Sequence, residues 1–159
     1  MKKLLFFFYA LVFAFIFSSC EELGELVGNK VEIESPYTDI VVSNFVCEGY
    51  TVNGDVYIDF DVVSTEADLR VWFGSAYAYI DDDTYKAPFI GYVDLFEDKK
   101  TKITYWGDTN SDGDYCCFER ISTKISHFDE IEVAIIVDGI EDVKYIKFKN
   151  VQIDWKDNF

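Results

Sequence analysis

The chain has 159 residues, of which 50% are hydrophobic and 18% aromatic, and its formal net charge at pH 7 is −16. So acidic a chain repels nucleic acid and favours divalent cations or basic partners. The high hydrophobic content and the low proline content, two residues, exclude a disordered chain. The length is enough for one domain with a hydrophobic core.

The first predicted element is a lipoprotein signal peptide over residues 1–19. Two lysines precede an uncharged run over residues 4–17. The run has the length of a secretory h-region and is shorter than the ~20 residues of a transmembrane helix. It ends in FSSC at residues 17–20, which resembles the lipobox of bacterial lipoproteins and implies acylation of Cys20. The alternatives are a signal peptide that is cut elsewhere and an uncleaved anchor.

Residues 20–37 are predicted to form an acidic tether that links the lipid to the folded domain. Glu21, Glu22 and Glu25 follow Cys20. In Bacteroidota-type lipoproteins such acidic residues resemble the signal for display on the outer face of the outer membrane. We therefore expect a lipid-anchored protein of the outer membrane at the cell surface. The periplasmic face, with the glutamates serving only as a solvated linker, is the alternative.

A β-hairpin is predicted next. In residues 55–63 apolar and polar side chains alternate, which indicates a strand with one face in the core. Asn53-Gly54 precedes this strand and favours a type I′ turn, in which both residues have positive φ. Residues 39–49 are therefore expected to pair antiparallel with residues 55–63.

Further strands are predicted along the rest of the chain, separated by acidic turns. They are LRVWFG, YAYI, KAPFIGYVDLF, TKITYW, ERISTKI, EIEVAIIVD and VKYIKFKNVQIDW. Because no helical period is present beyond the signal peptide, we expect an all-β fold. We interpret residues 38–159 as an immunoglobulin-like antiparallel β-sandwich of about 7–9 strands.

The order of these patterns resembles that of a family of small lipoprotein domains. VNGDVYIDFDVV is followed by a variable middle, by ISTKISHFDEIEVAIIVDG and by KYIKFKNVQI. This layout is similar to immunoglobulin-like, telokin-like domains of Bacteroidota-type lipoproteins whose role is unassigned. The resemblance implies the fold and no chemistry.

An acidic loop with the sequence DTNSDGDYCCFE matches the spacing of a calcium-binding loop, D-x-[DN]-x-[DN]-G-x5-E. Alternate oxygens in a tight loop suit the six to eight hard ligands that calcium prefers. The flanking segments are predicted strands, however, so a solvated hairpin tip is the other interpretation. The predicted metal ligands are Asp108, Asn110, Asp112, Asp114 and Glu119.

Three cysteines remain if Cys20 is acylated. Outside the cytosol a bridge from Cys47 to Cys116 or Cys117 would pin the acidic loop. A vicinal Cys116–Cys117 bridge is a second interpretation of these residues, and three buried thiols are a third.

The sequence contains no pattern that indicates an enzyme. His127 is the only histidine, and no G-x-S-x-G elbow accompanies it. We interpret His127 as a surface residue and expect no catalytic activity.

Aromatic residues concentrate in the middle of the chain, between residues 77 and 115. Exposed rings beside acids and amides could stack sugars or anchor a protein, whereas buried rings would fill the ends of the sandwich. The expected stacking residues are Tyr77, Tyr79, Tyr85, Tyr105 and Trp106, and Tyr92 and Tyr115 lie in the same region.

The sequence therefore predicts a lipid-anchored binding or accessory module of the cell envelope. Its ligand is an unknown protein or glycan, with calcium as the one candidate cofactor. The alternatives are a carbohydrate-binding accessory lipoprotein, which would use the tyrosine-rich loops, and an architectural envelope subunit.

Overall fold

The computed structural model describes residues 30–88, 90–105 and 116–157. These residues form strands and no helix, which confirms the all-β prediction. The strands within the described residues are β1 (Glu32–Glu34), β2 (Ile40–Tyr50), β3 (Asp55–Ser64), β4 (Leu69–Ile80), β5 (Asp83–Ala87), β6 (Gly91–Leu95), β7 (Thr101–Tyr105), β8 (His127–Val137), β9 (Lys144–Gln152) and β10 (Asp154–Lys156).

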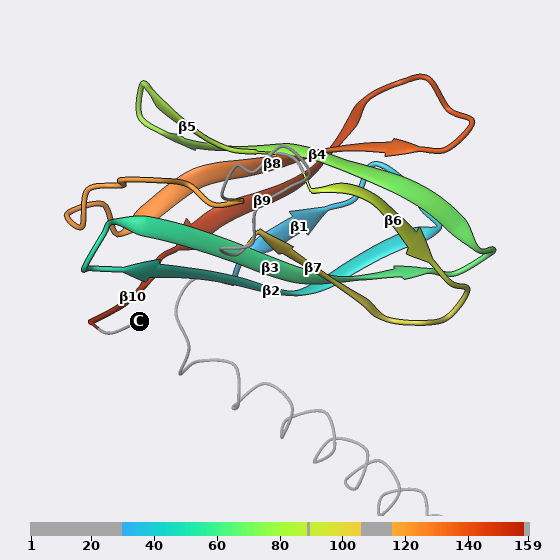
Figure 1. The fold of residues 1–159 in the computed structure, drawn as a ribbon, viewed down its shortest axis with the longest axis horizontal. Coiled ribbons are helices and arrows are strands. Elements are labelled where there is room, and N and C mark those ends of the chain that lie inside the picture. The colour runs from blue at the N-terminus through green and yellow to red at the C-terminus, as the bar shows by residue number, and fades with distance from the viewer. Residues whose placement is uncertain (1–29, 89, 106–115, 158–159) are drawn as a thin grey trace, which may run out of the picture. The chain divides into compact units, whose positions relative to one another are not determined.

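The strands form two sheets that pack as a sandwich (Figure 1). The six-stranded sheet has the order β1-β9-β8-β4-β5, with β6 also paired to β4, and the four-stranded sheet has the order β10-β2-β3-β7. The runs β9-β8-β4-β5 and β2-β3-β7 follow the G-F-C-C′ and A-B-E arrangement of immunoglobulin domains. The described strands number ten, more than the predicted 7–9, and β1 and β10 at the sheet edges have only three residues each.

The core lies between the sheets and follows the period-two pattern of the strands. The even-numbered residues of β3 from Val56 to Val62 are all at most 1% exposed, as the alternation predicted. The Phe60 ring lies 5.1 Å from the Phe148 ring and 6.3 Å from the Phe73 ring, which both belong to the other sheet. Burial of these rings, at ~1.5–3 kcal/mol each, stabilises the contact between the sheets.

The hairpin of β2 and β3 forms as predicted, but its turn is different. Tyr50 pairs with Asp55, so the loop is residues 51–54. Gly54 has φ of 76° and Asn53 has no positive φ, so the turn is not type I′. The Asn53 side chain accepts a hydrogen bond from the Asp55 N–H at 3.0 Å, which closes the longer loop locally.

Two further expectations differ from the structure. The compact domain begins at Val31 and β1 pairs with β9, so residues 31–37 belong to the sandwich and not to the tether. Residues 31–34 alternate apolar and acidic side chains, which is the period of a strand. The segment ERISTKI at residues 119–125 forms turns instead of a strand.

Candidate binding face

Aromatic and aliphatic side chains form a row across the outer face of the six-stranded sheet. Tyr92 on β6 pairs with Trp72 on β4, and Trp72 pairs with Ile136 on β8. Side chains in register on adjacent strands lie about 4.8 Å apart, so the three form a continuous row, which we call the aromatic row. Tyr92 is 61% exposed, and Trp72 and Ile136 are half-buried.

The Trp72 ring lies against the sheet because the chain has no side chain at Gly74. A Cβ built on Gly74 would come within 2.4 Å of Trp72 Cζ3 and 3.0 Å of Ala134 Cβ. Gly74 belongs to a β-bulge, since the pairing of β4 with β8 shifts between Phe73 and Ala76. The bulge thus creates the space that the indole fills.

Charged side chains lie beside the Tyr92 ring. The Arg70 guanidinium lies 4.8 Å from the centre of this ring, which is a cation–π contact. Arg70 Nε is also 3.9 Å from an Asp94 carboxylate oxygen. The Tyr92 ring thus has a hydrogen-bond donor, Arg70, and a hydrogen-bond acceptor, Asp94, near it.

A second group of rings lies beside the aromatic row on the same face. Tyr77 and Tyr79 of β4 pair with Glu132 and Glu130 of β8, and Tyr145 of β9 pairs with Ala134 of β8. Burial raises the pKa of Tyr79, as do Glu132 and the neighbouring Tyr145 and Tyr77. We call these three tyrosines, which share the outer face of neighbouring strands, the tyrosine cluster. Tyr145 is 40% exposed, and Tyr77 and Tyr79 are half-buried.

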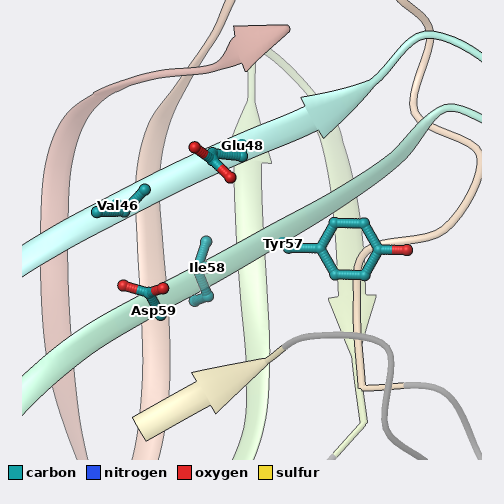
Figure 2. Close-up of a pocket in the computed structure, with 5 residues that line it drawn as sticks. All are labelled: Val46, Glu48, Tyr57, Ile58 and Asp59. Atoms are coloured by element: carbon teal, nitrogen blue, oxygen red, sulfur yellow. The ribbon is translucent and has the colours of Figure 1, made fainter. Parts of the chain in front are cut away.

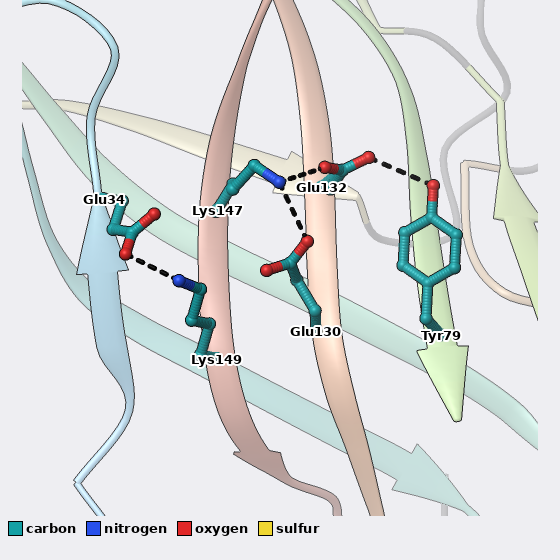
Figure 3. A network of polar contacts seen from close by, with 6 residues as sticks. All are labelled: Glu34, Tyr79, Glu130, Glu132, Lys147 and Lys149. Carbon is teal, nitrogen blue, oxygen red and sulfur yellow. Dashed lines mark hydrogen bonds and ion pairs between the residues drawn. The ribbon is translucent and has the colours of Figure 1, made fainter. Parts of the chain in front are cut away.

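A polar network, shown in Figure 3, connects Tyr79 of this cluster to charged side chains of β8 and β9. Lys147 donates to Glu130 Oε1 at 3.0 Å and lies 2.5 Å from Glu132 Oε1. The Tyr79 hydroxyl donates to Glu132 Oε2 at 3.0 Å, and Lys149 donates to Glu34 at 2.7 Å.

The hydrogen bonds of the network favour the charged forms of Glu132 and Lys147. Burial alone would raise the pKa of Glu132, but hydrogen bonds from Lys147 and Tyr79 outweigh it and lower the pKa. Hydrogen bonds to Glu132 and Glu130 raise the pKa of Lys147. A carboxylate and an ammonium held in these forms do not exchange protons near neutral pH, so the network suits positioning and not acid–base catalysis.

The outer face of the four-stranded sheet has a shallow depression that is open to solvent (Figure 2). It is lined by Val46, Glu48, Tyr57, Ile58 and Asp59. Asp59 is 8% exposed and its carboxylate pairs with the Lys102 ammonium at 2.8 Å. The depression is too shallow to enclose a ligand.

The predicted stacking residues separate into three groups. Tyr77 and Tyr79 lie on the face just described. Tyr105 is fully buried and donates its hydroxyl to the Gly74 carbonyl at 2.5 Å, so it cannot stack a ligand. Tyr85 is half-buried with its ring 6.0 Å from that of Phe128, so it packs against the core. Trp106 lies outside the described residues, as does Tyr115.

In the described structure Cys47 and Cys117 are free thiols, and Cys116 is also buried. Cys47 packs in the core between the sheets, whereas Cys117 packs with Tyr50 and Tyr57 in a separate cluster. Neither the predicted Cys47 bridge nor the vicinal bridge is therefore formed. Burial raises the pKa of Cys117 to about 12, and burial also raises the pKa of Cys47. Both thiols stay protonated and unreactive.

The predicted lipid and calcium sites fall mainly outside the described residues. These include Cys20 and four of the five predicted metal ligands: Asp108, Asn110, Asp112 and Asp114. The fifth, Glu119, is exposed. Within the described ranges no group of three or more acidic, cysteine or histidine residues is arranged to hold a metal ion. No helix in the same ranges is long and apolar enough to cross a bilayer.

His127 begins β8 and lies between two polar neighbours. Its Nδ1 is 3.5 Å from Ser126 Oγ, and its Nε2 is 3.7 Å from an Asp129 carboxylate oxygen. The second distance is longer than a hydrogen bond, so Asp129 does not orient the imidazole as nucleophilic catalysis requires.

Sequence reasoning did not select Trp72, Ile136 or Tyr145 for the binding face. The alternation in LRVWFG did place Trp72 on the opposite face from the core positions Val71 and Phe73. This alternation was the signal that could have identified Trp72 as a residue of the outer face. Comparison with models of protein families, with curated proteins and with solved structures found no match.

Proposed function

We propose that the protein is a non-catalytic binding module of the cell envelope that recognises its partner with the outer face of the six-stranded sheet. The observation that supports this function is the collection of rings on that face. A folded protein exposes single apolar side chains without consequence, but a connected aromatic surface is typical of an interaction site. The bond from Tyr79 to Glu132 restrains one of these rings, which lowers the entropy cost of binding there.

We further propose that lipid on Cys20 holds this module at the outer membrane, with the domain at the cell surface. The support is the sequence pattern alone: the charged start, the apolar run, the FSSC motif and the acidic residues that follow. Residues 21–30 then separate the lipid from the domain, because the sandwich begins at Val31.

Site-specific photo-crosslinking in cells tests the binding function. A photo-reactive amino acid replaces Tyr92 in one strain and Val52 in another. Val52 is the matched control, because it is 76% exposed at the tip of the β2–β3 hairpin, away from the proposed face. We expect a covalent adduct from position 92, of defined size with a protein partner and of heterogeneous size with a glycan, and none from position 52. Absence of an adduct from position 92, or equal adducts from both positions, would contradict the proposal.

A further inference from the structure

We infer that the outer face of the six-stranded sheet binds a neutral polysaccharide chain, an inference that rests on the proposed binding function and names its ligand class. Three properties of the face lead to this class of ligand. They are the placement of the rings on neighbouring strands, the polar groups beside them and the charge of the chain.

The first property is the geometry. Tyr92, Trp72 and Ile136 lie in register on three neighbouring strands. Tyr145 lies on the fourth strand, β9, where it pairs with Ala134, two residues along β8 from Ile136. With about 4.8 Å between strands, these four strands span ~14 Å of sheet surface. An open aromatic platform of this length suits an extended polymer, whose apolar ring faces can stack on several side chains in turn.

The second property is the mixture of apolar and polar groups. Arg70 and Asp94 stand beside Tyr92, and Lys147 and Glu132 stand beside the tyrosine cluster. A hot spot for a protein partner buries its rings in apolar pockets that exclude water. A sugar instead presents a C–H face surrounded by hydroxyl groups, which both donate and accept hydrogen bonds. The donors and acceptors around these rings match that pattern.

The third property is charge. The chain has a formal net charge of −16, which repels polyanions at low and moderate ionic strength. Uronate-rich or sulfated polymers are thereby disfavoured. An uncharged polymer meets no such barrier, and its binding requires only stacking and hydrogen bonds.

Affinity electrophoresis of the full-length protein tests the inference. The protein is extracted in a polyoxyethylene detergent, which contains no sugar, and is run through native gels that hold one soluble polymer each. The neutral probes are hydroxyethyl cellulose, pullulan, galactomannan and arabinoxylan, and alginate is the anionic probe. We expect at least one neutral polymer to retard the wild type, and alginate to have no effect.

Variants at exposed positions connect retardation to the face. Tyr92→Ala and Tyr145→Ala should each weaken binding by about tenfold or more, as expected for stacking rings. Tyr92→Phe keeps the ring and should bind nearly as the wild type does. Phe96→Ala is the matched control, because Phe96 is 49% exposed in the turn after β6. Circular dichroism checks that each variant is folded.

Three results would overturn the inference: no retardation by any neutral polymer, equal retardation by alginate, or full retardation of both alanine variants. A crosslinked protein adduct from position 92 together with no retardation would retain the proposed binding function and exclude the glycan. Absence of both the adduct and the retardation would reject the binding function as well.

Discussion

At the scale of single residues, Tyr105 connects the two sheets. Its ring comes from β7 in the four-stranded sheet, and its hydroxyl donates to the Gly74 carbonyl in the six-stranded sheet at 2.5 Å. The Gly74 carbonyl lies in the bulge of β4, where regular pairing with β8 is interrupted. The Tyr105 hydroxyl thus supplies a hydrogen bond to a buried carbonyl at the point where the β4–β8 backbone pairing is interrupted.

We predict that Tyr105→Phe destabilises the fold although it keeps the ring. The Gly74 carbonyl would lose its partner in the core, which costs about 1–3 kcal/mol for an unsatisfied buried group. Urea unfolding measures the difference. Tyr92→Phe is the control, because Tyr92 is exposed and its change should stay within about 0.5 kcal/mol. Equal stability of the two variants would mean that the Tyr105 hydroxyl bond does not stabilise the bulge.

We predict that Gly74→Ala moves the Trp72 indole. The new Cβ would lie 2.4–2.6 Å from two carbon atoms of the indole ring. Overpacking of this kind costs about 1–3 kcal/mol, and it changes the near-ultraviolet circular dichroism of tryptophan. Ser75→Ala, one residue along the same bulge, should leave that spectrum unchanged. An unaltered tryptophan signal in Gly74→Ala would show that the ring does not depend on the missing Cβ.

At the scale of elements, β2 has its own bulge at Asn44. Asn44 has φ of 52°, and the β2–β3 register shifts between Ser43 and Val46. The Asn44 side chain donates to an Asp61 carboxylate oxygen on β3 at 2.7 Å. This hydrogen bond is the largest cause of the lowered pKa of Asp61, and Lys100 lowers that pKa further.

The lowered pKa gives a pH dependence with a definite sign. Asp61 is ionised in both states above its usual pKa of 3.8, so the stabilisation by Asn44 is complete there and is lost as the pH falls below that value. We predict that Asn44→Gly, which keeps the positive φ, is less stable than the wild type at pH 7. The difference should shrink at pH 3. Chemical unfolding at both pH values measures this difference in stability. As the control, the effect of Asn44→Gly is measured in a chain that carries Asp61→Asn, where it should not change with pH. A difference that stays constant with pH would contradict this role of Asp61.

The two bulges explain how far the sequence could predict the structure. Alternation located the inner face of β3 and the pairing of β2 with β3, because both faces of a regular strand can be counted along the chain. Trp72 and Tyr77 have opposite parity, however, and share a face only because the bulge at Gly74 shifts the count. Bulges depend on contacts with distant strands, such as the bond from Tyr105, and local patterns do not record those contacts. The prediction of Tyr105 as a stacking residue was wrong for a different reason, because the regular alternation of β7 already places Tyr105 on the inner face with Ile103.

At the scale of the whole molecule, we have proposed that lipid on Cys20 carries the domain to the envelope. We predict that Cys20→Ala moves the protein from the detergent-rich to the aqueous phase in a phase-separation assay. Several acyl chains hold a protein stably to a membrane, whereas an unmodified domain is not held. Cys47→Ala is the control, because Cys47 is buried in the core and should leave the partition unchanged. Retention of Cys20→Ala in detergent would indicate an uncleaved anchor.

At this scale the central claim is that the partner binds the six-stranded sheet and not the four-stranded sheet. The outer face of the six-stranded sheet has the open rings, and the outer face of the four-stranded sheet has paired charges around a shallow depression. A partner should therefore cover one face and leave the other accessible.

Hydroxyl-radical footprinting tests this claim most directly. The protein is labelled in intact cells and, separately, after purification in detergent, and mass spectrometry gives the modification rate of each exposed ring. We predict that Tyr92 and Tyr145 are modified more slowly in cells than after purification, while Phe96 reacts at the same rate in both. Equal rates for Tyr92 and Tyr145 in cells and after purification would contradict the assignment of the binding face.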